Sequence, residues 1–345
     1  MKSFWNTLPR PFFALAPMAD VTDVVFRNLF AKYSQHGKSD GGPDVFWTEF
    51  VSSDGLMSEG KDHLLKDLVF TENERPIVAQ IFGANPDTVR YSASLVQDLG
   101  FDGIDINMGC PDRSVEKQGA GAALIQNPKR AREIIQSAKK GAPSLPVSVK
   151  TRIGYRKDEI DTWIPTLLDE GIDALTIHAR TRKELSLVPA RWEHVYRVVS
   201  LAESYETTII GNGDVATLED GIRLAAETGA TGVMVGRGAF GNPWFFNKRK
   251  CPVHSCYIGM PTQTFVRKRC ECISVEEKLR VLIEHTAQFE QQLGRHKNFA
   301  IMKKHYSAYV TGFAGAKELR MALMGCDDAS QIEEVIHNAI ERLAD

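Results

Sequence analysis

Gly103-Ile104-Asp105-Ile106-Asn107-Met108-Gly109-Cys110-Pro111 is the most informative part of this sequence of 345 residues. The run from Gly103 to Ile106 is short and apolar, and a glycine, a cysteine and a proline soon follow it. This pattern predicts a buried strand that stops abruptly and presents the thiol of Cys110 at its carboxyl end. Glycines 109, 119 and 121 allow the following loop to approach a ligand closely. A lone cysteine is more often a small buried hydrophobe, but this local sequence favours a chemical role for Cys110.

The composition is that of an ordinary globular protein. Hydrophobic residues make up 43% of the chain and charged residues 25%, which suffices for a sizeable core without disulfides or metals. The amino terminus has no apolar signal region, and no segment approaches the roughly 20 apolar residues of a membrane helix. We therefore expect a cytoplasmic protein with no membrane partner. We also expect a monomer, although no feature of the sequence shows the oligomeric state. Its six cysteines are expected to serve catalysis or metal binding.

Short apolar, β-branched runs recur at regular spacing and alternate with helical patterns. We expect strands over 12–18, 45–50, 77–83, 103–108, 147–153, 174–179, 207–211 and 232–236. We expect helices over 24–33, 86–99, 128–140, 159–170, 193–203 and 217–227. Alternating strands and helices imply a parallel sheet, and eight such units predict a (β/α)8 TIM barrel of the α/β class.

The alternation stops after Trp244-Phe245-Phe246. Residues 249–273 are irregular, and from Ser274 onward only helical periodicity remains, over 275–294, 298–309 and 329–344. Ser274 and Glu277 match a capping box. We therefore expect a barrel catalytic domain over 1–248, a basic cysteine-rich linker over 249–273 and an all-α helical domain over 274–345.

The charge is unevenly distributed. The whole chain has a formal net charge of −2, but residues 248–310 contain 12 Lys and Arg against 5 Asp and Glu. Charge alone is equally compatible with a solvated helical face. A basic segment between two acidic ones is nevertheless a candidate surface for a polyanion.

Polar side chains follow most of the predicted strands, and in a barrel function sits at the carboxyl ends of the strands. Taken alone, Lys150 would be interpreted as a surface residue and His178 as a hydrogen-bonded core residue. Six polar strand ends in one register favour a functional site. Gly211-Asn212-Gly213-Asp214 and Gly236-Arg237-Gly238 follow the last two strands. Glycine-rich turns in those two places commonly hold a phosphate.

Taken together, these motifs resemble the tRNA dihydrouridine synthases, flavin mononucleotide (FMN) enzymes that reduce the C5=C6 bond of a uridine with a nicotinamide reductant. The resemblance covers nearly the whole chain. It is closest to the bacterial type, whose helical domain has a Lys-Lys-His element, here Lys303-Lys304-His305. The segments that carry it are Ala16-Pro17-Met18, Asn107-Met108-Gly109-Cys110-Pro111, Gly119–Leu124, Lys150-Thr151-Arg152, Ile177-His178-Ala179-Arg180-Thr181, Gly211–Asp214, Gly236-Arg237-Gly238 and Gly241-Asn242-Pro243-Trp244.

The resemblance implies a role for each matching residue. Cys110 would be the general acid, and tRNA the macromolecular partner. The residues implied in FMN binding are Pro17 and Met18 beside the ring, Gln80 and Lys150 on the ring, His178 on the ring or ribityl chain, and Asn212, Gly213, Asp214, Gly236 and Arg237 around the phosphate. The residues implied in substrate binding are Asn107, Arg152 and Arg180 in the barrel, and Arg295, Lys297, Lys303 and Lys304 in the basic stretch.

The chemistry is consistent with the implied role of Cys110. Hydride from the reduced flavin would go to C6 of uracil, and C5 would then take a proton from the opposite face. A thiol with an unperturbed pKa of about 8.5 is mostly protonated at neutral pH and can donate. Asn107 and Arg152 could stabilise the developing negative charge. NADPH and NADH both remain possible as the reductant, and the position of the target uridine stays open.

A cluster of cysteines departs from the family pattern. Cys251, Cys256, Cys270 and Cys272 fall within a short stretch, with His254 between them. Four thiols in an irregular segment predict a small metal site, with tetrahedral zinc favoured and an iron–sulfur cluster as the alternative. The remaining interpretation is four unpaired thiols in a linker.

Two other functions fit parts of the sequence. A flavin barrel acting on a free pyrimidine, as in dihydroorotate dehydrogenase, would not need the helical domain or the basic stretch. A tRNA-binding protein without catalysis would not need Cys110 or the phosphate-type turns.

Overall fold

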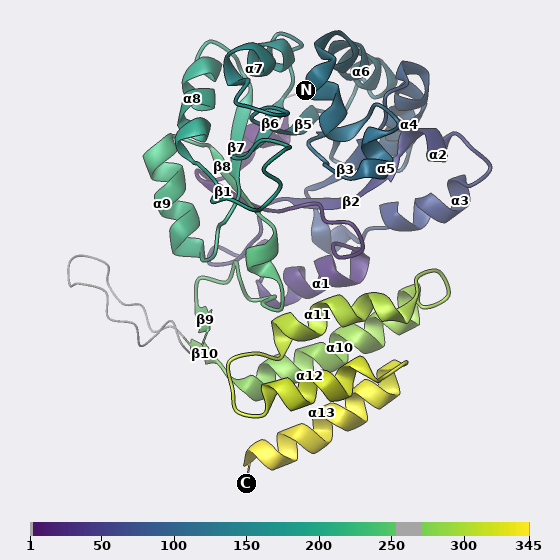
Figure 1. Cartoon of the computed structure of the whole chain (residues 1–345), viewed down its shortest axis with the longest axis vertical. Helices are drawn as coiled ribbons and strands as arrows, with labels where there is room; N and C mark the ends of the chain where they lie inside the picture. The colour runs from purple at the N-terminus through teal and green to yellow at the C-terminus, as the bar shows by residue number, and fades with distance from the viewer. Residues whose placement is uncertain (1–2, 253–270, 345) are drawn as a thin grey trace. The chain divides into compact units, whose positions relative to one another are not determined.

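The computed structural model of the protein describes residues 3–252 and 271–344 (Figure 1). By its contacts the chain divides into two compact units. The first comprises residues 1–24 and 43–238, and the second comprises 25–42 and 239–345. The predicted boundary at residue 248 differs from this division. Residue 248 lies ten residues past the end of the first unit. The prediction also assigned residues 25–42 to the barrel domain, whereas they pack with the C-terminal helices.

Eight parallel strands form the centre of the first unit. They are β1 (Phe12–Leu15), β2 (Phe46–Ser52), β3 (Ile77–Phe82), β4 (Gly103–Met108), β5 (Val147–Arg152), β6 (Ala174–His178), β7 (Thr208–Asn212) and β8 (Gly232–Val235). Their order in the sheet is β1-β8-β7-β6-β5-β4-β3-β2. A parallel bridge from Ala14 to Val45 joins β1 to the start of β2. The prediction of a (β/α)8 barrel is confirmed.

Helices surround these strands (Figure 1). They are α2 (Ser53–Leu56), α3 (Lys61–Leu64), α4 (Pro86–Asp98), α5 (Arg113–Glu116), α6 (Pro128–Gly141), α7 (Ile160–Leu168), α8 (Glu193–Ala202) and α9 (Leu218–Thr228). Single 3₁₀ turns occur at Phe4–Thr7, Leu65–Leu68, Glu72–Glu74, Gly121–Gln126 and Arg237–Ala239. Asn85, Asn127 and Thr217 cap α4, α6 and α9 with their side chains, which explains why these boundaries were predictable.

Because side chains alternate between the two faces of a strand, one buried residue shows which positions of its strand face the inside of the barrel. Phe12, Val78, Ile210 and Met234 belong to one buried cluster, so alternate residues on their strands point inward. Two residues further along β3, the interior position is taken by Gln80. Further toward the carboxyl ends, Asn107 lies opposite Lys150, and Arg152, His178 and Asn212 lie opposite one another in register. The pairing therefore collects the predicted polar residues at one rim.

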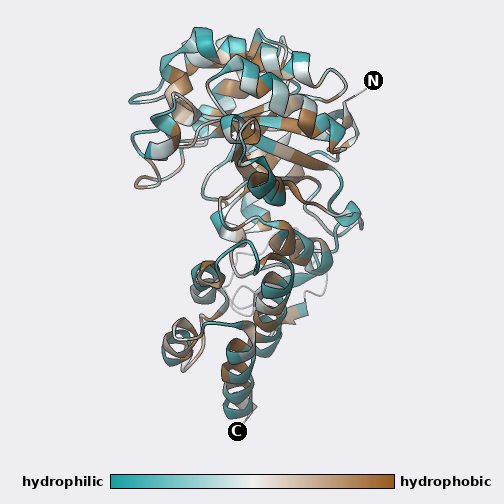
Figure 2. Cartoon of the chain, turned by 90° about the vertical axis from the view of Figure 1, so that its right-hand side faces the viewer, coloured by the Kyte–Doolittle hydropathy of each residue, from teal (hydrophilic) through white to brown (hydrophobic). Residues whose placement is uncertain are grey.

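The second unit is helical. It contains α1 (Val24–Tyr33, from Val25 onward), α10 (Val275–Leu293), α11 (Lys303–Tyr309), α12 (Ala316–Met324) and α13 (Ala329–Ala344), and a 3₁₀ turn at Phe299–Met302. Apolar and polar residues alternate along these helices (Figure 2). The predicted capping box of Ser274 and Glu277 begins α10. None of the helices in the described part of the chain has both the length and the apolar character needed to span a membrane.

Three elements of this unit were not predicted. Short strands β9 (Lys250–Pro252) and β10 (Glu271–Ile273) pair in parallel, with Cys251 opposite Cys272. Helix α12 begins after Gly315, whose φ of +82° stops the chain from continuing as a helix from upstream. Its nine residues are too few to show a clear helical period in the sequence.

Aromatic rings connect α1 to the C-terminal helices of the same unit. Phe26 lies 5.9 Å from the ring of His285 and 5.6 Å from that of His305. Phe240 stacks on His305 with ring centroids 5.6 Å apart. Both histidines are buried, so this cluster forms the apolar centre of the second unit.

Candidate active site

The peptide groups around Cys110 are held from both sides. Oδ1 of Asn107 accepts the backbone N–H groups of Gly109 at 3.1 Å and of Cys110 at 2.8 Å. Nε of Arg152 donates to the carbonyl of Gly109 at 2.8 Å, and Nη2 of Arg182 donates to the carbonyl of Pro111 at 3.3 Å. The half-buried Cys110 therefore sits on a rigid loop directly after β4.

The glycine-rich loop that follows completes this support. The N–H of Ala122 donates to the carbonyl of Cys110 at 3.0 Å. Gly121 has φ +59°, and a Cβ there would lie 2.8 Å from that same carbonyl oxygen. Only glycine allows this close approach without strain.

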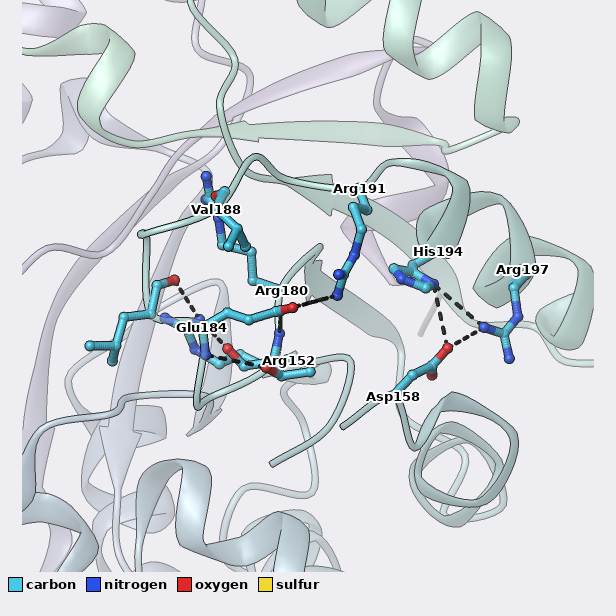
Figure 3. A network of polar contacts seen from close by, with 10 residues as sticks. Arg152, Asp158, Arg180, Glu184, Val188, Arg191, His194 and Arg197 are labelled. Atoms are coloured by element: carbon cyan, nitrogen blue, oxygen red, sulfur yellow. Dashed lines mark hydrogen bonds and ion pairs between the residues drawn. The ribbon is translucent and has the colours of Figure 1, made fainter. Parts of the chain in front are cut away.

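Arg152 and Arg182 reach Cys110 from neighbouring strand ends. Nη1 of Arg152 also donates to the carbonyls of Thr181 and Leu185, both at 3.1 Å, and Figure 3 shows Arg152 beneath the loop that carries Glu184. Arg182 forms a paired contact with the carboxylate of Glu116 and lies 5.5 Å from the ring of Tyr155. The predicted contact of Arg152 with uracil stays a prediction. Sequence reasoning assigned no role to Arg182, because its partners are distant in the chain.

Electrostatics keep the thiol protonated. Burial raises the pKa of Cys110 above its ordinary value, while Arg152 and Lys150 act in the opposite direction with smaller effect. A protonated thiol can donate a proton, whereas a thiolate would be a nucleophile. The environment of Cys110 therefore suits a general acid.

Lys150 and Arg180 bring two cations together beside His178 near the ends of β5 and β6. Nζ of Lys150 donates to Oδ1 of Asn212 at 3.2 Å, and Nη1 of Arg180 lies 3.1 Å from Nε2 of His178. Burial and the neighbouring Arg152 lower the pKa of Lys150 to about 8. Burial and then Lys150 lower the pKa of His178 well below its usual value, so His178 is neutral. Such a group favours an anionic or electron-rich ligand.

The turns after β7 and β8 meet at Asp214. Its carboxylate pairs with Arg180, accepts the N–H of Ala190 at 2.8 Å and lies 3.5 Å from Arg237. The side chain of Arg237 is 67% exposed. Asp214 therefore orients two arginines, and the guanidinium of Arg237 is accessible to a ligand.

Close packing and a positive φ require glycine at position 213 of these turns. Gly213 has φ +126°, and a Cβ there would lie 2.7 Å from Cβ of Ala190. A Cβ on Gly236 would lie 3.6 Å from Sδ of Met18, so the predicted contact residues Pro17 and Met18 adjoin the eighth strand. The backbone of Gly236 is partly exposed, whereas Gly213 is buried against Ala190 and His178.

An FMN molecule fits this set of groups. Its phosphate needs backbone N–H groups and a cation; the glycine turns after β7 and β8 contain backbone without side chains, and Arg237 is an exposed cation. Its ring needs a cation or hydrogen-bond donor beside it, which Lys150 offers. Gln80, the other predicted ring contact, is fully buried, and its amide bonds to Asp105 and Asn107.

The predicted tRNA contacts lie in the second unit. Arg295 follows α10, Lys297 precedes the next turn, and Lys303 and Lys304 begin α11. Arg295 and Lys304 are exposed, and Lys297 and Lys303 are half-buried.

Most of the predicted metal site lies outside the described residues. Cys256, Cys270 and the nearby His254 are not described, nor is the side chain of Cys251. Cys272 is exposed on β10. Within residues 3–252 and 271–344, no group of three or more His, Cys, Asp or Glu side chains could hold a metal ion. The zinc or iron–sulfur site stays a prediction.

Comparison with known proteins identifies the family. The family model described as dihydrouridine synthase matches residues 14–345. The probable tRNA-dihydrouridine synthase of Staphylococcus epidermidis is 38% identical over 340 residues, which cover 97% of this chain and 95% of that protein. The probable tRNA-dihydrouridine synthase 2 of Bacillus subtilis is 38% identical over 339 residues, covering 97% and 96%.

Among solved structures, histamine dehydrogenase from Rhizobium sp. 4-9 is similar with a TM-score of 0.48 and 12% sequence identity. The similarity covers 68% of this chain and 44% of that chain. The family match also confirms the prediction of an oxidoreductase enzyme. Since the family model matches almost the whole length, and relatives with 38% identity extend over 97% of it, this chain belongs to the dihydrouridine synthase family, as its motifs predicted.

Proposed function

We propose that this protein reduces the C5=C6 bond of specific uridines in tRNA, with FMN as its cofactor, Cys110 as proton donor and NADPH or NADH as the external reductant. The observation that carries the proposal is the rigid frame around a protonated thiol. Asn107, Arg152 and Arg182 hold the peptides beside Cys110, and burial raises the pKa of its thiol. The names of the relatives support tRNA as the substrate.

Each group of residues has a defined task in this reaction. When bound and reduced by the nicotinamide, FMN would supply the hydride that adds to C6 of uracil. Cys110 then gives the proton of its Sγ to C5, and its loop keeps that proton in a fixed place. Lys150 stabilises negative charge on the ring system beside it, and Arg237 with the turn at Gly213 holds the phosphate.

The tRNA is bound by the basic stretch of the second unit. Arg295, Lys297, Lys303 and Lys304 contact phosphates, which position the RNA without reading its sequence. The target uridine has to leave its stack to reach the carboxyl ends of the strands. Loop uridines are therefore easier substrates than paired ones. The protein would act as a cytoplasmic monomer, and gel filtration measures its oligomeric state.

The test is a pair of cysteine variants. Protein purified without oxygen should show two flavin absorption bands that bleach with NADPH and return when unmodified tRNA is added. Cys110→Ala should lower the rate of that return by at least about 100-fold while tRNA binding stays unchanged. Cys326→Ala is the matched control, since Cys326 is a buried cysteine in the second unit.

Two outcomes would favour the other functions. Reoxidation by free orotate or uracil, with none by tRNA, would indicate a free-pyrimidine enzyme. A folded protein that binds tRNA but shows no flavin bands, even after FMN is added, would indicate a tRNA-binding protein without catalysis.

A further inference from the structure

A buried carboxylate lies inside the barrel below the loop of Cys110. Asp105 is on β4, two residues before Asn107, and none of its surface is exposed. Oδ1 of Asp105 accepts a hydrogen bond from Oγ of Ser148 at 2.6 Å, and Oδ2 accepts one from Nε2 of Gln80, also at 2.6 Å. Burying a carboxylate is costly, so its presence among interior residues needs an explanation.

The bonds of Asp105 continue as a directed chain to Cys110. Oε1 of Gln80 accepts from Nδ2 of Asn107 at 2.9 Å. Oδ1 of Asn107 accepts from the backbone N–H of Cys110 at 2.8 Å. Every donor in this chain points toward Asp105, and every acceptor points toward Cys110. An amide can be turned by half a rotation, so something has to select this orientation for both Gln80 and Asn107.

The two ends of the chain make that selection. Backbone N–H groups can only donate, so they require the oxygen of Asn107. A carboxylate can only accept, so it requires the nitrogen of Gln80. A turned Gln80 would place its oxygen against a carboxylate oxygen and its nitrogen against the nitrogen of Asn107. Asp105 therefore excludes the turned orientation of Gln80, and the backbone N–H groups exclude that of Asn107.

We propose that Asp105 is a positioning residue for proton donation: by accepting from Gln80 it fixes the orientation of Gln80, which in turn accepts from Asn107 and so helps to hold the peptide group of Cys110 in place. This inference rests on the proposed function, because it concerns the step in which Cys110 protonates the substrate. Asp105 touches neither the substrate nor the thiol. It acts through two amides and one peptide group.

The charges around Asp105 support the required acceptor state. Lys150 is the charged group that acts on it, and Ser148 and Gln80 donate hydrogen bonds to it. Burial raises the pKa of Asp105 to about 6 against these opposing effects. At neutral pH the carboxylate is therefore mostly ionised and remains a pure acceptor.

The experiment compares three variants in two half-reactions of the FMN-loaded protein. Asp105→Leu keeps the branching at Cγ but has no acceptor. Asp105→Asn keeps one acceptor oxygen, which can face Gln80 while its NH₂ faces the hydroxyl of Ser148. Ser148→Ala removes a hydroxyl that donates to Asp105 but takes no part in the series of hydrogen bonds from Asp105 to Cys110. The measured quantities are the rate of flavin reduction by NADPH and the rate of flavin reoxidation by a tRNA transcript without modifications.

We expect Asp105→Leu to slow reoxidation by about tenfold or more while reduction stays within about twofold of wild type, because only reoxidation uses Cys110. Asp105→Asn should restore reoxidation to within about threefold of wild type, and Ser148→Ala should change it by less than about twofold. If Asp105→Leu does not fold, Asp105→Ser takes its place, since a serine hydroxyl is too short to reach Gln80, and the same slowing is expected.

Three results would overturn the inference. The first is wild-type reoxidation in the folded, FMN-loaded Leu or Ser variant. The second is an equal slowing of both half-reactions, which would show a role in the cofactor site. The third is an Asn variant as slow as the Leu variant, which would show that charge is needed rather than an acceptor. If wild-type flavin is not reoxidised by tRNA at all, the proposed function fails and takes this inference with it.

Discussion

Arg182 donates a hydrogen bond to the carbonyl of Pro111 while its guanidinium also pairs with the carboxylate of Glu116. It thus links the loop after β6 to the residue that follows Cys110. On the other side of Cys110, Arg152 binds the carbonyl of Gly109. Two arginines from neighbouring strand ends therefore fix the peptide groups that flank the proposed proton donor.

Removing the guanidinium of Arg182 should loosen this loop. We expect Arg182→Met to slow flavin reoxidation by tRNA by about tenfold, because a hydrogen bond from a charged group is worth about 1.5–3 kcal/mol. Flavin content should stay unchanged. Arg223→Met on α9 is the control, since Arg223 pairs only with exposed acidic side chains in its own helix among the described residues. An unchanged reoxidation rate in Arg182→Met would contradict the role of Arg182.

The raised pKa of Cys110 predicts the pH dependence of the same step. The donor has to be protonated, and burial shifts the pKa of its thiol upward, so activity should persist above the ordinary thiol value of about 8.5 and fall only at higher pH. The measurement is the rate of reoxidation by tRNA from neutral to alkaline pH. A rate that already declines between about pH 6 and about pH 7.5, as expected for a lowered thiol pKa, would contradict this assignment.

The buried His305 predicts that the second unit is sensitive to acid. Burial and the nearby Lys304 lower its pKa to about 4 in the folded protein, against about 6.5 when unfolded. The unfolded chain then binds more protons, so stability is full above the unfolded pKa and falls as the pH drops toward the folded one. At about pH 5.5 this costs about 1 kcal/mol relative to about pH 7.5.

We expect His305→Phe to remove that part of the pH dependence, because Phe26 and Phe240 already surround the ring. Denaturant unfolding at the two pH values measures it. The stability difference between them should be smaller in the variant by about 1 kcal/mol. An equal difference in both proteins would show that His305 is not the group responsible.

Gly213 predicts a specific loss of the cofactor. Its φ of +126° and the 2.7 Å approach of Ala190 leave no room for a Cβ. We expect Gly213→Ala to distort the turn and lower the FMN content of the purified protein by about tenfold. Gly229→Ala is the matched control, because Gly229 has φ +75° at the end of α9, away from the site. It should cost about 1 kcal/mol of stability and retain FMN. Equal flavin loss in both variants would indicate general strain.

The cysteine cluster predicts bound metal. Elemental analysis of the purified protein should find zinc, or iron with a broad absorption shoulder if the site is an iron–sulfur cluster. Replacing Cys270 and Cys272 by serine should lower both the metal content and the affinity for tRNA. Unchanged metal content in that double variant would remove the hypothesis.

Many helix and strand boundaries could be predicted from local sequence. Strand β4 and helix α1 were predicted with the bounds that the structure has, and α4 and α6 begin at the predicted residues, Pro86 and Pro128. Local rules account for this, since an Asn cap followed by proline needs no distant partner. The helix α12 was not predicted, because glycines on both sides limit it to nine residues, too few to show a helical period. The strands β9 and β10 were not predicted either, because three residues are too few to show an alternation of apolar and polar side chains.

The order of strands and helices, the place of Cys110 at a strand end and the family were determined by the sequence, because periodicity, caps and motifs are properties of adjacent residues. The partners of the site residues were decided only by the tertiary structure. Gln80 meets Asp105 across 25 residues, and Arg182 meets Glu116 across 66. Such pairs exist only once the barrel has closed and its register is set, and no local pattern encodes them.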